Sequence, residues 1–272
     1  MVGATLTRVE QRRPDLRFPF PDQFVRRLTG CVITGVARRA KYLVVTLSSA
    51  DALVMHLGMS GRFTINQRTF GDYIYDTGCD PKHDHVIFTL SNGASIVYND
   101  PRRFGFMLLI PQADLDAHPL FASLGVEPLG NALNAAYLAG KAHGRGVDLK
   151  AFLLDQRTVA GLGNIYVSEA LHRAQLSPRR LASTLARANG KPTERAERLV
   201  PQIRAVLHEA IDAGGSSLRD YRHTDGTAGG FQNAFSVYGR GGEPCLRTGC
   251  CGTIARTVQA QRATYSCGQC QR

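Results

Sequence analysis

The stretch CLRTGCCGTIARTVQAQRATYSCGQC, residues 245–270, holds five of the seven cysteines in a chain of 272 residues. A C-x2-C pair at its end follows an earlier pair of cysteines at a spacing typical of zinc ribbons and zinc fingers. Four thiolates suit a closed tetrahedral zinc site, and so short a module cannot fold on an apolar core of its own. The stretch therefore predicts a β-hairpin pinned by one structural zinc ion.

The first ligand pair leaves a choice between Cys250 and its neighbour Cys251. We favour Cys250, because it leaves sixteen residues before Cys267. Cys251 would shorten the hairpin between the first and the second pair of cysteine ligands. Two disulfides or scattered thiols are the alternative. The N-terminus lacks the apolar segment of a secretion signal, and disulfides are rare in proteins that are not exported. The expected zinc ligands are Cys245, Cys250, Cys267 and Cys270.

The region before the cysteines carries apolar residues at helical spacing, over 134–142, 149–159, 165–174 and 194–213. Pro201 lies inside the last of these ranges. It is expected to kink or break that helix, because proline lacks the backbone N–H and clashes with the preceding turn. Gly214-Gly215 then acts as a C-terminal stop.

The first hundred or so residues consist of short apolar runs separated by turn residues, with strands expected at 41–49, 51–59, 85–90, 94–98 and 104–110. Ser91-Asn92-Gly93 marks a hairpin between two of these strands. Several short strands with tight turns predict an antiparallel sandwich or barrel. Cys31 and Cys79 lie alone in this region, and we expect a core thiol and a loop thiol rather than metal ligands.

The balance of charge is strongly basic, with 33 Lys and Arg residues against 22 Asp and Glu and a net charge of +11. Arginine makes up 28 of those 33 cations, and its guanidinium binds phosphate in a bidentate fashion. A polyanionic partner is therefore expected. A hydrophobic content of 43% argues against a disordered chain, and no apolar run approaches the length of about 18 residues that a membrane-spanning helix needs.

Several short motifs follow one another along the whole chain. They are RRAKY at 38–42, HLGMSG at 56–61, KHDHV at 82–86, DPRRFG at 100–105, GLGNIY at 161–166, GGSSL at 214–218, VYGR at 237–240 and QRAT at 261–264. Together with the cysteines, these motifs make the chain resemble the bacterial formamidopyrimidine-DNA glycosylases, the Fpg branch of the Fpg/Nei family. The HLGMSG and DPRRFG forms favour that branch over the Nei branch, which prefers oxidised pyrimidines.

The resemblance implies an α+β multidomain fold. It places an N-terminal antiparallel β-sandwich at residues 1–112, a helix-two-turn-helix domain at 113–235 and a C-terminal zinc-finger β-hairpin at 236–272. DNA would lie in the cleft between the domains, and the loop 223–232 would cover the flipped base.

The resemblance also implies base-excision repair by a bifunctional DNA glycosylase and abasic-site lyase. Family members remove 8-oxoguanine and formamidopyrimidines and then cut the strand by β,δ-elimination. The expected partner is double-stranded DNA that contains oxidised purines or abasic sites, and the expected cofactor is one structural zinc ion. We further expect a monomer in the bacterial cytoplasm, without a membrane partner.

Two residues match catalytic positions of the family. Lys41 would contact the phosphate beside the lesion and donate a proton for β-elimination. Arg262, near the tip of the zinc-finger hairpin, would grip phosphate and serve δ-elimination. Matching DNA-contact positions are His83, Arg145 and Asn164. Without the family, Asn164 would be read as a helix cap and His83 as an ordinary loop histidine.

Met59, Arg102 and Phe104 match the residues that fill the gap left by a flipped base. Extruding a base costs on the order of a few kcal/mol, and apolar wedges support the opened stack. Phe104 would wedge the stack, and Arg102 would face the orphaned cytosine. Judged by residue type alone, Met59 and Phe104 would be core residues at strand ends.

The start of the chain departs from the family pattern. The family begins with Pro-Glu-Leu-Pro-Glu after the initiator Met, where the proline amine attacks the sugar C1′ and the glutamate moves protons. This chain begins Met1-Val2-Gly3-Ala4-Thr5, which aligns with a family segment after the first helix. We favour a start that is assigned too far downstream. The alternative is a catalytically impaired binder of damaged DNA or abasic sites. For the chain as written we expect DNA binding without efficient glycosylase action, with residual strand cleavage through Lys41 at an abasic site.

Overall fold

The computed structural model of the chain describes residues 1–66, 80–216 and 229–272. The chain folds as two compact units, one built on Met1–Ala122 and the other on Ser123–Gly215 with Gly230–Arg272. Each unit has its own apolar core. Among the described residues, no helix is both long and apolar enough to cross a lipid bilayer.

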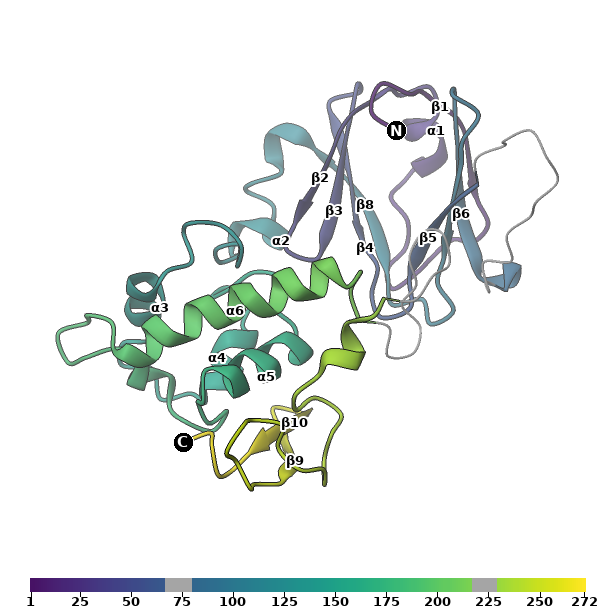
Figure 1. Cartoon of the computed structure of the whole chain (residues 1–272). Helices are drawn as coiled ribbons and strands as arrows, with labels where there is room; N and C mark the ends of the chain where they lie inside the picture. The colour runs from purple at the N-terminus through teal and green to yellow at the C-terminus, as the bar shows by residue number, and fades with distance from the viewer. Residues whose placement is uncertain (67–79, 217–228) are drawn as a thin grey trace. The chain divides into compact units, whose positions relative to one another are not determined.

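The first unit is a sandwich of two four-stranded antiparallel sheets, with strand orders β2-β3-β4-β8 and β1-β6-β7-β5 (Figure 1). The strands are β1 (Leu6–Gln11), β2 (Ile33–Arg39), β3 (Tyr42–Leu47), β4 (Asp51–His56), β5 (Arg62–Asn66), β6 (Asp84–Leu90), β7 (Ser95–Asn99) and β8 (Phe106–Pro111). The short helices of this unit are α1 (Phe24–Leu28), η1 (Pro81–His83), η2 (Gln112–Asp114) and α2 (Pro119–Ala122). The expected antiparallel β-sandwich is therefore confirmed.

The hairpin between β6 and β7 follows directly from its residues. Val86, Phe88 and Leu90 alternate along β6 and bury their side chains in the core between the sheets. Gly93 has a φ of +85°, a left-handed conformation that favours glycine, and its N–H donates to the Leu90 carbonyl at 3.0 Å. The strands expected at 85–90 and 94–98 are confirmed within one residue at each end.

Three strands of the sandwich, β1, β2 and β5, were not expected. In β2 only Ile33 is buried, so the strand carries no alternating apolar pattern that a sequence could reveal. Cys31 is buried in the core of this unit, as expected, whereas Cys79 lies outside the described residues.

An apolar cavity of about 170 Å³ lies within the sandwich. Its lining includes Met1, Val36 and Ile65, which are 46%, 46% and 41% exposed. The core of the first unit is therefore open to solvent at this side.

The second unit contains the main helices and the cysteine-bearing hairpin, coloured teal to yellow in Figure 1. Its elements are α3 (Ala135–Ala142), α4 (Leu149–Leu154), α5 (Asn164–Arg173), η3 (Ala182–Leu185), α6 (Glu194–Asp212), η4 (Phe231–Ala234), β9 (Ile254–Gln259) and β10 (Arg262–Cys267). The core forms where α5 packs on α6, with Val167 and Leu171 of one helix and Leu199 and Ile203 of the other fully buried.

Pro201 was expected to kink or break α6, and the helix continues through it without a break. Leu199 before the proline and Ile203 and Val206 after it are fully buried in one core. Interior proline disfavours a helix by about 3 kcal/mol. Burial of a single large apolar side chain contributes about 1.5–3 kcal/mol, so three such side chains outweigh the proline.

The end of α6 matches the expected glycine stop. Gly214 and Gly215 have φ values of +69° and +85°. The N–H of Gly214 donates to the Ile211 carbonyl at 2.9 Å, and that of Gly215 donates to the Ala210 carbonyl at 2.6 Å. This pair of bonds is the Schellman motif, which satisfies carbonyls left open at a helix end.

Helix α4 is shorter than the expected range 149–159 and ends at Leu154. The chain leaves the helix because the Asp155 side chain accepts the backbone N–H of Arg157 at 3.0 Å, which forms a local turn. Beyond this turn Val159 forms an isolated parallel bridge with Val126. The helices expected at 134–142 and 165–174 are confirmed as α3 and α5.

Candidate metal centre and nucleic-acid interface

The second unit brings Cys245, Cys250, Cys267 and Cys270 together, with all four sulfurs within 4.8 Å of one another. The Sγ–Sγ separations are 3.6 Å for Cys250 and Cys267 and 3.8 Å for Cys245 and Cys270. Disulfides need about 2.05 Å, whereas a tetrahedral ion with Zn–S bonds of about 2.3 Å separates its sulfurs by about 3.8 Å. The cluster thus fits a metal ion, and Cys251 is exposed beside it.

Cys267 and Cys270 differ in their affinity for protons. Burial, with hydrogen bonds to neighbouring thiols, raises the pKa of Cys270 to about 12. Burial also acts to raise the pKa of Cys267, but hydrogen bonds with the backbone of Cys270 and Gln269 lower it to about 7. A thiol with a pKa of about 12 stays protonated near neutral pH. A bound cation would hold the Cys270 sulfur as a thiolate at that pH.

The cysteine hairpin turns tightly between β9 and β10. Ala260 and Gln261 have φ values of +47° and +60°, which is typical of a type I′ turn. Arg262 is the first residue of β10 and is exposed, so it lies next to the tip as expected.

Two side chains of the helical part bind the hairpin directly behind Arg262. The Nζ of Lys150 donates to the Ala263 carbonyl at 2.9 Å and to the Thr264 hydroxyl at 2.6 Å, although Lys150 is only 1% exposed. Burial, and then the charge of Arg262, lower the pKa of Lys150 to about 8. Asn164 Nδ2 donates to the same Ala263 carbonyl at 2.9 Å.

Asn164 does not cap α5, because the N-cap position belongs to Gly163. Asn164 is the first helical residue, and its buried Oδ1 has no hydrogen-bond partner among the described residues. Arg145 is exposed between α3 and α4, and its charge contributes to the low pKa of Asp155, after the larger effect of Arg157. Residues 223–228 of the expected base-covering loop lie outside the described residues.

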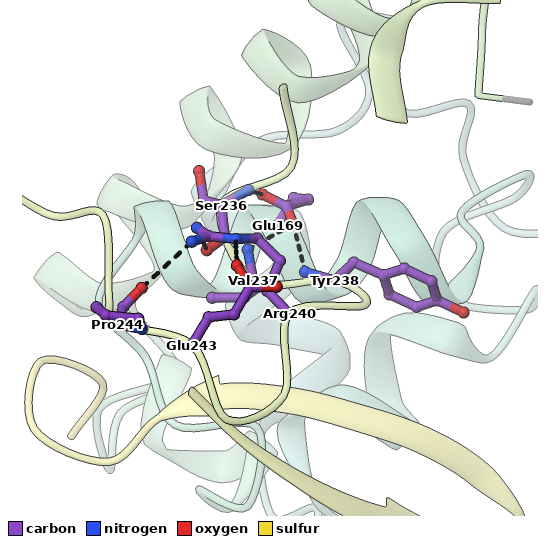
Figure 2. Close-up of polar contacts among 7 residues, drawn as sticks. All are labelled: Glu169, Ser236, Val237, Tyr238, Arg240, Glu243 and Pro244. Atoms are coloured by element: carbon purple, nitrogen blue, oxygen red, sulfur yellow. Dashed lines mark hydrogen bonds and ion pairs between the residues drawn. The ribbon is translucent and has the colours of Figure 1, made fainter. Parts of the chain in front are cut away.

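The segment that leads to the cysteines is anchored on a buried carboxylate (Figure 2). Glu169 of α5 is 0% exposed and accepts the backbone N–H groups of Ser236, Val237 and Tyr238 at 2.8–3.0 Å. A little further along, Arg240 forms an ion pair with Glu243 at 2.8 Å. These bonds fix the direction from which the chain enters the metal site.

In the first unit, Lys41 lies in the tight turn between β2 and β3, directly after Ala40, which has a φ of +52°. Lys41 is exposed. Its charge acts on His56, the pKa of which is lowered first by burial and then by Lys41 and Arg17.

Met59 and Phe104 are exposed, by 63% and 45%, so the core interpretation from residue type is wrong. The guanidinium of Arg102 lies over the Phe104 ring, 4.8 Å from its centroid. The three residues occupy two loops, one between β4 and β5 and the other between β7 and β8. The unit therefore presents two apolar side chains and a cation to solvent at these loops.

A buried carboxylate joins these two loops. Asp100 is 0% exposed, and its oxygens accept the Ser60 hydroxyl at 2.5 Å, the Tyr98 hydroxyl at 3.0 Å and the Gly105 N–H at 2.9 Å. Ser60 Oγ in turn accepts the N–H of Arg102 at 3.1 Å. Burial, together with Asp100, raises the pKa of Tyr98, which stays a neutral donor. Sequence analysis missed Asp100, although it lies in the DPRRFG motif.

The loops also meet through a glycine. A side chain at Gly58 would place its Cβ 2.5 Å from the backbone carbon of Phe104, so only glycine permits this approach. His83 lies in η1, and its carbonyl accepts the N–H of Asp100 at 3.0 Å. The half-buried ring of His83 lies 6.4 Å from that of His85.

Comparisons with known proteins agree with these features. The family model for the formamidopyrimidine-DNA glycosylase N-terminal domain matches residues 1–107, and the model for the H2TH domain of the same enzymes matches residues 124–222. Formamidopyrimidine-DNA glycosylase of Beijerinckia indica is 60% identical over 273 residues, which cover 100% of this chain and 94% of that protein. The same enzyme of Methylocella silvestris is 57% identical over 275 residues, with the same coverage.

Solved structures show the same likeness. The MutM (Fpg) protein of Thermus thermophilus is 38% identical with a TM-score of 0.81, covering 100% of this chain and 92% of that one. Lactococcus lactis Fpg in complex with abasic-site DNA is 30% identical with a TM-score of 0.83, covering 100% and 94%. Since two family models match most of the chain and close relatives align over its whole length, the chain belongs to the formamidopyrimidine-DNA glycosylase family.

Proposed function

We propose that this DNA glycosylase of base-excision repair removes oxidised purines, namely 8-oxoguanine and formamidopyrimidines, from double-stranded DNA and cuts the strand by β,δ-elimination. The observation that carries the proposal is the exposed pair Met59 and Phe104, with Arg102 stacked on Phe104. Large apolar side chains held at loop tips suit insertion into a base stack.

The wedge consists of Met59, Arg102 and Phe104, and it acts when a base leaves the duplex. Extruding a base costs about a few kcal/mol, which the enzyme must offset. Phe104 and Met59 fill the gap and bury their exposed apolar surface, which contributes about 25 cal/mol per Å². The guanidinium of Arg102 donates to the acceptors of the orphaned cytosine. Because Asp100 holds both loops before DNA arrives, little conformational entropy is lost on binding.

The phosphate contacts come from cations and amides of both units. Lys41 and His83 in the first unit, and Arg145, Asn164 and Arg262 in the second, would neutralise or hydrogen-bond the backbone. Lys41 would also protonate the leaving group of β-elimination, and Arg262 would serve δ-elimination. Cys245, Cys250, Cys267 and Cys270 would hold one zinc ion, which supplies structure rather than reaction chemistry by fixing the hairpin that presents Arg262.

The experiment compares Phe104→Ala with Ile211→Ala, a control at an apolar side chain that is 61% exposed on α6. Binding is measured to a duplex with an abasic-site analogue opposite cytosine, with 2-aminopurine beside the gap as a probe of stacking. Phe104→Ala should bind about 10-fold more weakly, equivalent to ~1.4 kcal/mol, and should leave 2-aminopurine stacked, while the control behaves as wild type. Equal affinity and equal fluorescence for both variants would contradict the proposal that Phe104 inserts into the base stack.

A further inference from the structure

The last turn of α5 contacts the first cysteine knuckle, residues 245–250, through a side chain and through its backbone. His172 is 3% exposed, and its Nε2 lies 3.3 Å from Cys245 Sγ. In the opposite direction, Arg247 Nη2 donates to the carbonyls of His172 at 2.7 Å and Arg173 at 3.2 Å. The knuckle is therefore attached to the helix by residues on both sides.

The direction of the bond between His172 and Cys245 follows from the chemistry of the cysteine. A metal-bound thiolate has no proton to donate, so Nε2 must carry the hydrogen. Nδ1 of His172 is then an acceptor, and this buried atom has no hydrogen-bond partner within the described parts of the chain. Burying an unsatisfied acceptor costs about 1–3 kcal/mol. A phenylalanine of similar size would avoid that cost, so the useful feature of the histidine is its Nε2–H.

The Nε2–H of His172 can offset the negative charge of a zinc ion bound by four thiolates. A zinc ion with four thiolates carries a net charge of about −2, and hydrogen bonds to the sulfurs offset it. Cys250 Sγ accepts the Gly252 N–H at 3.4 Å, and Cys245 Sγ accepts the His172 Nε2–H. Each sulfur of the first ligand pair thus receives a donor.

Helix α5 also reaches the other end of the zinc module, where Asn164 at its first residue holds the Ala263 carbonyl beside Arg262. We propose that His172 is a positioning residue. Its Nε2–H stabilises the Cys245 thiolate and holds the cysteine-bearing segment, residues 245–270, in place against α5. The proposal depends on the zinc site and does not depend on glycosylase action.

The test uses the full-length, zinc-loaded chain without DNA. Zinc transfer to a chromogenic chelator and alkylation of Cys245 by iodoacetamide are measured for His172→Phe, His172→Gln and the surface control His208→Phe. His172→Phe should release zinc and react about 10–100-fold faster, since loss of a ligand's hydrogen-bond partner weakens metal affinity by that order. His172→Gln, which retains an N–H donor, should recover much of the difference, and the control should match wild type.

Equal rates for wild type and His172→Phe would overturn the proposal, as would equal acceleration in the Phe and Gln variants. A measurement on the unmodified protein guards against a variant that fails to fold. Long-range ¹H–¹⁵N correlation spectra of zinc-loaded wild type should show the proton of His172 on Nε2. A proton on Nδ1 with a bare Nε2 would contradict the assigned bond.

Discussion

At the scale of single residues, the candidate site depends on polar groups that are hidden from solvent. Asp100 accepts hydrogen bonds from one donor in each of the two loops and from Tyr98 of β7, and Lys150 binds the hairpin beside Arg262. Neither side chain is exposed, so neither is available to touch DNA in the described structure. Both instead fix the positions of residues that are exposed.

Asp100→Asn should lower the free energy of unfolding by about 2–3 kcal/mol. An amide NH₂ in place of Oδ2 would face two donors, the Tyr98 hydroxyl and the Gly105 N–H, and leave a buried group unsatisfied. Thermal denaturation measures the loss, and exposed Asp114→Asn is the control. The variant should also discriminate less between cytosine and adenine opposite an abasic-site analogue. An unchanged melting temperature would show that Asp100 does not hold the loops.

The buried Lys150 should make the free energy of unfolding change with pH in the alkaline range. Its pKa is about 8 in the folded chain, and lysine titrates near 10.4 when unfolded, so between these values the unfolded chain binds more protons. The free energy of unfolding should therefore rise with pH in this window, by about 1–2 kcal/mol from about pH 7.5 to about pH 9.5. Urea titrations at both pH values should show that Lys150→Met loses this rise and that exposed Lys141→Met retains it. The same rise in all three proteins would contradict the assignment.

At the scale of elements, apolar runs bounded by turn residues were enough to predict β3, β4, β6, β7 and β8. Helical spacing predicted α3, α5 and the start of α6, and the glycine stop predicted its end. The failures have different causes: a local turn at Asp155 ends α4 early, whereas packing against distant residues keeps α6 intact. Pro201 stays within α6 because residues on both sides of it are packed in the core. Strand β2 was not predicted because only one of its side chains is buried, so it has no alternating apolar pattern. The cysteine spacing, by contrast, correctly indicated the cluster of four thiols.

A substitution at Gly252 tests how the four cysteine sulfurs are arranged. A Cβ at this position would lie 2.6 Å from Cys267 Sγ, inside the metal site. Gly252→Ala should therefore purify with less than about half the zinc of wild type, measured by elemental analysis, because metal affinity falls when ligand geometry is distorted. Gly268→Ala is the matched control, since nothing lies within 4 Å of its added Cβ. Full zinc occupancy in Gly252→Ala would mean that the sulfurs are arranged differently.

At the scale of the whole molecule, the net charge of +11 agrees with a DNA-binding enzyme, but it identifies no residue by itself. The ordered motifs supplied the candidate residues. They did not reveal Asp100, Lys150 or His172, because the roles of these residues arise from pairs far apart in the chain. Ser60 and Asp100 are 40 residues apart, and Lys150 and Thr264 are 114 residues apart.

The dependence of DNA affinity on salt concentration distinguishes a cation that contacts phosphate from one that only adds to the net positive charge of the protein. Arg262→Gln should reduce the slope of log K against log salt by about 1, because it would remove the phosphate contact proposed for Arg262. Arg187→Gln, at an exposed arginine with no assigned DNA contact, removes the same charge and should leave the slope nearly unchanged. Filter binding or anisotropy between about 50 and 200 mM salt measures both. Identical slopes for the two variants would remove Arg262 from the list of phosphate contacts.

The central proposal is that this DNA glycosylase recognises and excises an oxidised purine. The most direct measurement is a single-turnover reaction with a duplex that carries 8-oxoguanine opposite cytosine, followed by quantification of free base and of cut strand. For the protein produced with the family's N-terminal Pro-Glu-Leu-Pro-Glu segment, we predict release of 8-oxoguanine together with strand cleavage, and no release of guanine from the undamaged duplex. Intact damaged DNA at saturating protein, with equal affinity for the damaged and undamaged duplexes, would contradict the account.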